Sequence, residues 1–160
     1  MTGSKKPLSE MTDENWMRHA IRLAERAEQQ GEVPVGAVVV YQNQVIAEGW
    51  NQPIQQHDPS AHAEIMALRS AGLALNNYRL LDCTLYVTLE PCIMCLGAIT
   101  NARIKRLVFG AYDDKRGAIC SALRLSEAKF LNHHCDWQGA ILQDTCAKLL
   151  SDFFKAKRQA

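Results

Sequence analysis

Residues 84–110, TLYVTLEPCIMCLGAITNARIKRLVFG, decide the fold class, because they predict a strand, a helix and a second strand in succession. The β-branched and aromatic run TLYVT at 84–88 predicts a strand. Pro91 suits the first turn of a helix, where its missing N–H costs nothing. The nearly all-apolar residues after it predict a buried helix to about Asn101. The run RLVFG at 106–110 predicts the next strand, so the segment indicates an α/β domain.

The flanking segments fit the same class. An apolar stripe predicts a helix over 14–30 that stops at Gly31. The run VGAVVVY at 35–41 predicts a buried strand, and 45–49 its hairpin partner. A helix is predicted near 60–72, and a final helix places one apolar face toward the core, made of Leu142, Cys146, Leu149, Leu150 and Phe153. This order predicts a layered α/β domain with a mixed sheet.

The 160 residues predict a single domain, 1–160, whose polar first segment, 1–13, is expected to be frayed. Residues 121–139 give no clear pattern. The chain shows no secretory apolar region near its start and no run of roughly 18 apolar residues that could span a membrane. We therefore expect no membrane association and a cytoplasmic location, where the six cysteines are reduced.

The formal net charge of +1 excludes a broad basic surface that would steer a polyanion. Any nucleic-acid binding must come from local basic clusters, although such clusters are more often solvated faces. There are three of them: Arg103, Lys105 and Arg106; Lys115 and Arg116; and Lys155, Lys157 and Arg158.

Two short motifs carry the chemistry, His62-Ala63-Glu64 and Pro91-Cys92-Ile93-Met94-Cys95. A Cys-x-x-Cys pair alone could be a redox dithiol, half of a structural zinc site or two core cysteines. A zinc finger needs a second close pair, and the remaining cysteines are isolated. A histidine or an acid would then complete the site.

Helix geometry brings these side chains together. Cys92 and Cys95 are three residues apart and share one helix face, where the helix N-terminus favours thiolates. His62 and Glu64 can both approach one ion only if it lies beyond the N-terminal end of their helix. The segment 58–60, Asp-Pro-Ser, marks such a start.

The count of ligands favours catalysis over structure. Two thiolates and one imidazole give three protein ligands, whereas structural zinc sites normally have four. Zinc lowers the pKa of a bound water to about 7. Glu64, beside the metal and not needed as a ligand, is then placed to take and return the proton.

The combination of His-x-Glu with Pro-Cys-x-x-Cys resembles the cytidine-deaminase-like zinc deaminases. The closer resemblance is to the bacterial tRNA-specific adenosine deaminases. It extends through EVPVGAVVV, GWN, HDPSAHAEIMALR, NYRLLDCTLYVTLEPCIMC, VFGAYDDKRGA and LLSDFF, and fades over 121–136 and the first dozen residues.

The resemblance implies a three-layer α-β-α fold with a central mixed sheet of about five strands. It implies one Zn²⁺ per chain, held by His62, Cys92 and Cys95, with Glu64 as the catalytic acid and base. The implied reaction is hydrolysis of adenosine to inosine at the wobble position of a tRNA anticodon, and the implied assembly is a homodimer.

The resemblance also implies substrate contacts. Asn51 would contact the nucleoside, and the segment 32–36, with Glu32 and Val35, would line its pocket. Asp113 would lie near the RNA backbone, and Phe154 with Arg158 near the anticodon flank. Each contact has a structural alternative: Asn51 as a turn residue, for example, or Phe154 as part of the core.

Other functions stay open. A deaminase of a free base or nucleoside, such as guanine, cytosine or cytidine, would use the same zinc chemistry. A non-catalytic zinc-binding module is a remoter alternative, which Glu64 argues against. His133 and His134 would be surface residues or ligands of a second metal.

Overall fold

A five-stranded mixed sheet lies at the centre of the fold, in a computed structural model that describes residues 11–159. The strands are β1 (Gly36–Tyr41), β2 (Gln44–Trp50), β3 (Thr84–Leu89), β4 (Arg106–Ala111) and β5 (Asp136–Gln138). Their order across the sheet is β2-β1-β3-β4-β5. β1 pairs antiparallel with β2 and β3, whereas β4 pairs parallel with β3 and β5.

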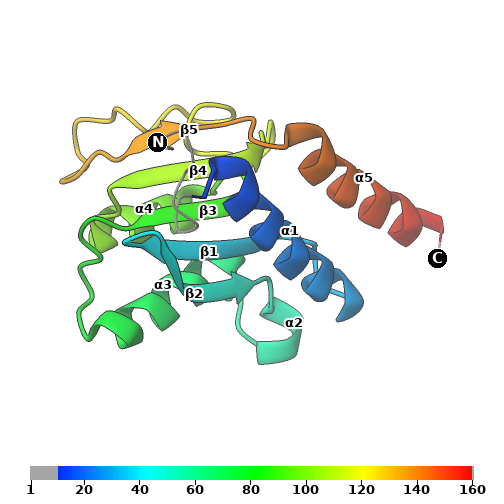
Figure 1. Ribbon diagram of the computed structural model, residues 1–160. Coiled ribbons are helices and arrows are strands. Elements are labelled where there is room, and N and C mark those ends of the chain that lie inside the picture. The colour runs from blue at the N-terminus through cyan, green and yellow to red at the C-terminus, as the bar shows by residue number, and fades with distance from the viewer. Residues whose placement is uncertain (1–10, 160) are drawn as a thin grey trace, which may run out of the picture.

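Helices cover both faces of this sheet (Figure 1). The helices are α1 (Asp13–Gln29), α2 (Pro53–Gln56), α3 (Ala63–Leu75), α4 (Ile93–Ala102) and α5 (Gln143–Gln159). In Figure 1, α1 lies across the near face and α4 behind the sheet, while α5 extends away at the right. This is the predicted three-layer α-β-α fold.

Alternating side chains of the strands build two separate cores, because successive residues point to opposite faces. Val38, Tyr86 and Val108 pack with Met17 of α1 and Cys146 of α5. The residues between them on the strands face α3 and α4; they are Ala37, Val39, Leu85, Val87, Leu107 and Phe109. The cleft described below opens where β3 and β4 end.

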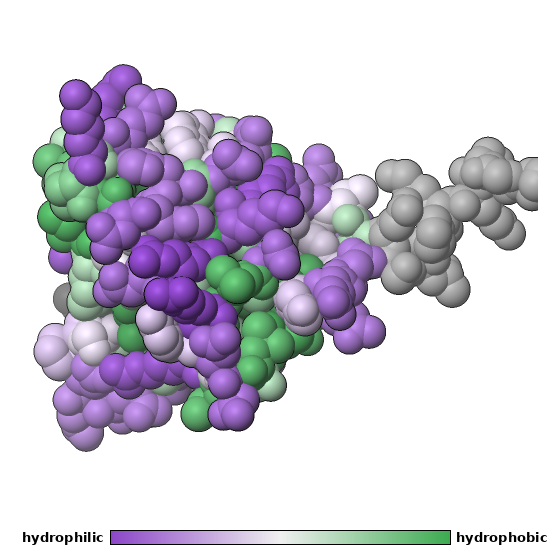
Figure 2. All heavy atoms as spheres, turned by 90° about the vertical axis from the view of Figure 1, so that its left-hand side faces the viewer, coloured by the Kyte–Doolittle hydropathy of each residue, from purple (hydrophilic) through white to green (hydrophobic). Residues whose placement is uncertain are grey.

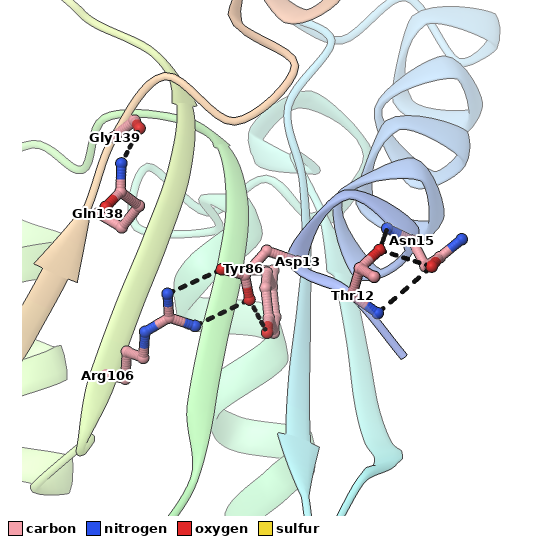
Figure 3. Close-up of polar contacts among 7 residues, drawn as sticks. All are labelled: Thr12, Asp13, Asn15, Tyr86, Arg106, Gln138 and Gly139. Carbon is pink, nitrogen blue, oxygen red and sulfur yellow. Dashed lines mark hydrogen bonds and ion pairs between the residues drawn. The ribbon is translucent and has the colours of Figure 1, made fainter. Parts of the chain in front are cut away.

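The first helix is anchored by polar contacts at its start (Figure 3). Thr12 and Asn15 form a capping box, in which the Thr12 hydroxyl accepts from the Asn15 N–H at 3.2 Å. Asp13 accepts two hydrogen bonds of 2.8 Å from Arg106 of β4 and one of 2.7 Å from Tyr86 of β3. Residues 1–10 of the predicted frayed segment lie outside the described residues, whereas Thr12 and Asp13 belong to the ordered start of α1.

Several predicted boundaries move. The hairpin turn is only Gln42-Asn43, both with positive φ, because this two-residue geometry matches the strand twist. The segment between the strand at 45–49 and the helix near 60–72 contains the short helix α2. The helix predicted to start at Pro91 is α4, and it begins at Ile93. Its first turn is open to solvent, with Ile93 60% and Met94 37% exposed. The expectation of burial all round is therefore wrong at this turn, because only one face of α4 meets the sheet.

The segment without a sequence pattern, 121–139, supplies the short edge strand β5, which pairs with β4 from Arg106 to Val108. Its three residues are exposed.

Within the described part of the chain, no helix is both long and apolar enough to cross a membrane. Figure 2 shows the end of the molecule at the left of Figure 1, where hydrophilic residues predominate and apolar ones are exposed in more than one place.

Candidate metal centre and substrate cleft

Two helix N-termini meet at the candidate metal centre. His62 is the N-cap of α3, and Cys92 is the N-cap of α4, with Cys95 in its first turn. The predicted start of α3 near Ser60 is wrong by one turn. Asp58 accepts hydrogen bonds from the backbone N–H and hydroxyl of Ser60, and this local turn holds 58–60 outside the helix.

The far end of α3 also differs from prediction. The helix runs past Gly72 to Leu75 and ends where Asn76 adopts the left-handed conformation, with φ of 53°. Asparagine tolerates that conformation better than most residues.

The three ligand side chains are spaced as a zinc ion requires. His62 Nδ1 lies 3.6 Å from both Cys92 Sγ and Cys95 Sγ. Zn–S bonds of about 2.3 Å and a Zn–N bond of about 2.0 Å at tetrahedral angles separate sulfur from nitrogen by roughly 3.6 Å. Among residues 11–159, this is the one group of three or more potential ligand side chains with that proximity. The donor set therefore fits Zn²⁺.

Electrostatics in the centre favour deprotonated sulfur at Cys92. Hydrogen bonding to Cys95, followed by that to His62, lowers the pKa of Cys92 to about 3. The same pairing with Cys92 raises the pKa of the Cys95 thiol. The hydrogen bond to Cys92 also raises the pKa of His62.

Glu64 lies in the first turn of α3, with its side chain in the wall of the same cleft. The residue is only 4% exposed. Burial disfavours the charged carboxylate and raises the pKa of Glu64 to about 7. A carboxyl group with a pKa near neutrality can both accept and donate a proton in turnover, which is what a general acid–base residue needs.

A cleft of about 720 Å³ contains this centre. His62, Cys92 and Glu64 line it together with five of the six predicted substrate residues: Val35, Asn51, Asp113, Phe154 and Arg158. The chain brings these residues together from the start of β1, the end of β2, the loop after β4 and the helix α5.

Asn51 does more than fill a turn. Its side-chain oxygen accepts a hydrogen bond of 2.8 Å from the N–H of Ala63, the first residue of α3. This contact fixes the helix start between His62 and Glu64. Asn51 thus faces the cleft and orients the helix that carries two of the site residues.

Glu32 does not line the cleft. It is 2% exposed, and its carboxylate accepts hydrogen bonds from the N–H groups of Ile54 and Gln55 at 3.2 and 2.8 Å. These donors are in the first turn of α2, where a negative charge is stabilising. Glu32 therefore holds α2 against the start of β1, and its neighbours Val33 and Val35 contact the cleft.

Sequence reasoning missed one buried polar residue, Glu90, which lies between β3 and Cys92 and is 2% exposed. An acid at the end of a buried strand, directly before the Pro-Cys pair, was an available signal. Burial alone would raise the pKa of Glu90, but hydrogen bonds from Cys120, Ser121 and Asp113 outweigh it and lower that pKa.

The basic clusters predicted from the sequence differ in whether their residues line the cleft. Lys115 and Arg116 line the cleft, as does Arg158. Arg106 is instead paired with Asp13. His133 and His134 each hydrogen-bond a backbone carbonyl, of Ile104 and Ala128, and belong to no ligand cluster among the described residues.

Comparison with known families agrees with this geometry. The family described as the cytidine and deoxycytidylate deaminase zinc-binding region matches residues 10–111. A tRNA-specific adenosine deaminase of Haemophilus influenzae is 52% identical over 148 residues, covering 92% of this chain and 86% of the relative. The enzyme of the same name from Bacillus subtilis is 40% identical, covering 92% and 91%.

Solved structures show the same pattern. One comes from studies of A-to-I editing by tRNA:A34 deaminases at the wobble position; it has a TM-score of 0.83 and 41% identity, and the match covers 85% of this chain and 99% of that one. A guanine deaminase of Bacillus subtilis has a TM-score of 0.61 and 43% identity, with 64% and 66% covered.

Proposed function

Because the chain belongs to the family of tRNA-specific adenosine deaminases, we propose that it hydrolyses adenosine to inosine at the wobble position of a tRNA anticodon. The observation that carries the proposal is the cleft in which Glu64 and the cluster of His62, Cys92 and Cys95 lie together. We propose that the cluster holds one Zn²⁺ per chain. When bound, zinc supplies the Lewis acidity that activates a water molecule for attack on the amine-bearing carbon of adenine.

Glu64 is the proposed proton carrier. In this role its carboxylate takes one proton from the attacking water and delivers it to the adenine ring nitrogen. It then takes the second proton, from the hydroxyl group that has added to the carbon, and gives it to the amino group, which leaves as ammonia. The raised pKa of about 7 supports both directions of transfer. Burial of the side chain also keeps bulk water from competing for that proton.

We propose five substrate contacts around the cleft. Asn51 and Val35 contact the nucleoside, Asp113 approaches the RNA backbone, and Phe154 with Arg158 contacts the anticodon flank. Their support is a common position in the cleft wall, with Phe154 44% exposed and so available for stacking on a base. Glu32 acts indirectly, through α2.

An anticodon loop suits this cleft. Its bases are already unpaired, so extruding the target adenosine costs less than it would in a duplex. The small net charge agrees with a few local RNA contacts. Transfer RNA and reduced thiols occur together in the cytoplasm, which is the location we propose.

We also propose a homodimer. Ile93 and Met94, 60% and 37% exposed, present an apolar surface beside Cys92 at the start of α4. Contiguous apolar surface is one mark of a protein–protein interface, and these two adjacent side chains are the support for the proposed dimer.

A free purine base is the competing substrate, since a guanine deaminase of Bacillus subtilis is 43% identical to the matched part of this chain. Its support is weaker, because that match covers 64% of this chain against 85% for the tRNA:A34 deaminase.

The test incubates zinc-loaded protein with five substrates in parallel. Two are anticodon stem-loops, with adenosine or with cytidine at the wobble position, and three are the free compounds adenosine, guanine and cytidine. We expect inosine and ammonia from the adenosine stem-loop alone at appreciable rate. Efficient turnover of guanine or free nucleoside would replace the tRNA proposal by a small-molecule deaminase, and zinc binding without any turnover would favour a binding module.

A further inference from the structure

Glu90 receives an unusual number of hydrogen bonds from one loop. Its Oε1 accepts from the Asp113 N–H at 3.1 Å and from the Ser121 hydroxyl at 2.5 Å. Its Oε2 accepts from the N–H groups of Ile119, Cys120 and Ser121 at 3.1, 2.9 and 3.1 Å. All five donors belong to residues 113–121, which we call the cleft loop.

The cleft loop has one face on the cleft and one on Glu90. Asp113, Asp114, Lys115 and Arg116 line the cleft. The Asp113 carboxylate accepts from the N–H groups of Lys115 and Arg116 at 3.0 and 3.1 Å, so the turn that presents these side chains starts at Asp113. The backbone N–H of Asp113 is itself held by Glu90.

Glu90 is fixed from the other side by the sheet. It follows β3 directly, and its own N–H donates to the carbonyl of Ala111 at the end of β4, 2.8 Å away. The next residue, Pro91, accepts from the N–H of Ala118 at 2.9 Å. The carboxylate therefore connects the rigid sheet and the start of α4 to the loop.

Gly117 leaves the room for this arrangement. A Cβ at that position would lie 2.3 Å from the carboxyl carbon of Glu90, far inside van der Waals contact. A glycine that lets the loop backbone close over a buried carboxylate indicates that the contact shapes the loop.

We infer that Glu90 is a positioning residue, which holds the cleft loop so that Asp113, Lys115 and Arg116 meet the nucleotides flanking the target base. This inference rests on the proposed RNA substrate. Charge-assisted hydrogen bonds are roughly twice as strong as neutral ones, and the five bonds share one side chain. Because the loop contacts the RNA away from the reacting atoms, Glu90 governs substrate binding rather than the chemical step.

The test uses the zinc-loaded full chain and the variant Glu90→Gln. Both oxygens of the Glu90 carboxylate accept hydrogen bonds, whereas a glutamine side chain has one accepting oxygen and one NH2 group. The donors that face the NH2 group, at Asp113 or at residues 119–121, therefore lose their acceptor. We expect faster amide hydrogen exchange across residues 113–121, unchanged zinc content, and a KM for the adenosine stem-loop raised about tenfold with kcat nearly constant. Glu127→Gln, the same change at an exposed acid in the following segment, is the matched control and should alter none of these.

Gly117→Ala provides an independent route, because it displaces the carboxylate without removing it. It should raise the amide exchange of residues 113–121 and the KM for the stem-loop in the same way. The double variant, Glu90→Gln with Gly117→Ala, should have nearly the same exchange rates and KM as either single variant, since both substitutions remove the same contact. Unchanged exchange of the loop in both variants would overturn the inference, as would a loss of zinc in Glu90→Gln or a fall in kcat at constant KM. If the wild-type protein fails to act on the stem-loop, the proposed substrate is wrong, while the exchange measurements still decide whether Glu90 holds the loop.

Discussion

At the scale of single residues, the candidate metal centre and the proposed proton carrier can be tested separately. Glu64 lies in the cleft wall beside the cluster of His62, Cys92 and Cys95 without being part of it. Glu64 is only 4% exposed, so replacement of its carboxyl group by an amide of the same shape changes the chemistry and little else. The three candidate ligands, in contrast, come from the N-termini of two different helices, α3 and α4.

We expect Glu64→Gln to keep zinc and fold but to lose turnover by at least about 10²–10⁴-fold, the usual contribution of a general acid–base residue.

Cys92→Ala should lose both zinc and turnover, and its melting temperature should fall because metal binding contributes to folding. Metal analysis, calorimetry and inosine formation measure these outcomes. Cys135→Ala, at a thiol outside the cluster, is the control and should retain zinc. Substantial turnover by Glu64→Gln would refute the assignment.

At the scale of elements, α1 is attached to the sheet by one polar contact that reaches two strands (Figure 3). Arg106 of β4 lowers the pKa of Asp13 chiefly through their hydrogen bonds, and Tyr86 of β3 adds to this effect. A carboxyl group whose pKa is depressed by folding stabilises the folded state above its unfolded pKa. That contribution is lost as the pH falls through the lower, folded value.

Asp13→Asn should therefore lower the free energy of unfolding by about 1–2 kcal/mol at pH 7, allowing for partial solvent screening of both partners. The difference from wild type should begin to shrink below about pH 4, since the ordinary pKa of this group is 3.8. Urea denaturation of both proteins at several pH values measures it. Glu14→Gln, in the same helical turn but in an exposed pair with Arg18, should have less than about 0.5 kcal/mol effect. A difference that persists undiminished at pH 3 would contradict the ion pair.

The last helix, α5, meets the rest of the molecule mainly through its first half, with Cys146 buried against Gly110 of β4. A side chain at position 110 would collide with the Cys146 sulfur at 2.4 Å, so the glycine permits the close approach. The second half of the helix carries Phe154 and Arg158 along the cleft.

Removing Lys155 and Arg158 together should weaken stem-loop binding and flatten its dependence on salt, by roughly 0.7 in the log–log slope for each lost phosphate contact. Binding titrations at several salt concentrations measure both quantities. The matched control removes Arg103 and Lys105, one arginine and one lysine just before β4, away from the cleft. Equal effects of the two double variants would show that only overall charge matters.

At the scale of the whole molecule, the exposed start of α4 leads to a prediction about assembly. We expect sedimentation at micromolar concentration to give twice the chain mass. Ile93→Glu should shift the equilibrium toward monomer, because a buried interface cannot accept an unpaired charge without cost. Phe130→Glu, at a 72% exposed side chain in another segment, serves as the control. A monomer throughout the wild-type concentration range would contradict the proposed dimer.

The sequence alone was enough to predict the α/β class, and it singled out the two motifs whose side chains meet in the candidate metal centre. Helix and strand periods are local, so α1, β1, β3 and β4 could be predicted to within a residue or two. The spacing of Cys92 and Cys95 likewise places both sulfurs on one helix face. The spacing left a histidine or an acid to complete the site, and the family resemblance implied His62 as that ligand. The family resemblance supplied the number of strands and the substrate residues.

Only the tertiary structure decided what the polar residues between these elements do. Glu90 binds residues 23 to 31 positions away, and Glu32 binds residues 22 and 23 positions away. A pattern of neighbouring residues in the sequence cannot predict hydrogen-bond partners at such distances along the chain. The same holds for β5, which is a strand because β4 offers it backbone partners and not because of its own residues. Local periodicity thus determines most of the helices and strands. Hydrogen bonds between distant segments determine that β5 forms and where the cleft loop, α2 and the start of α3 lie.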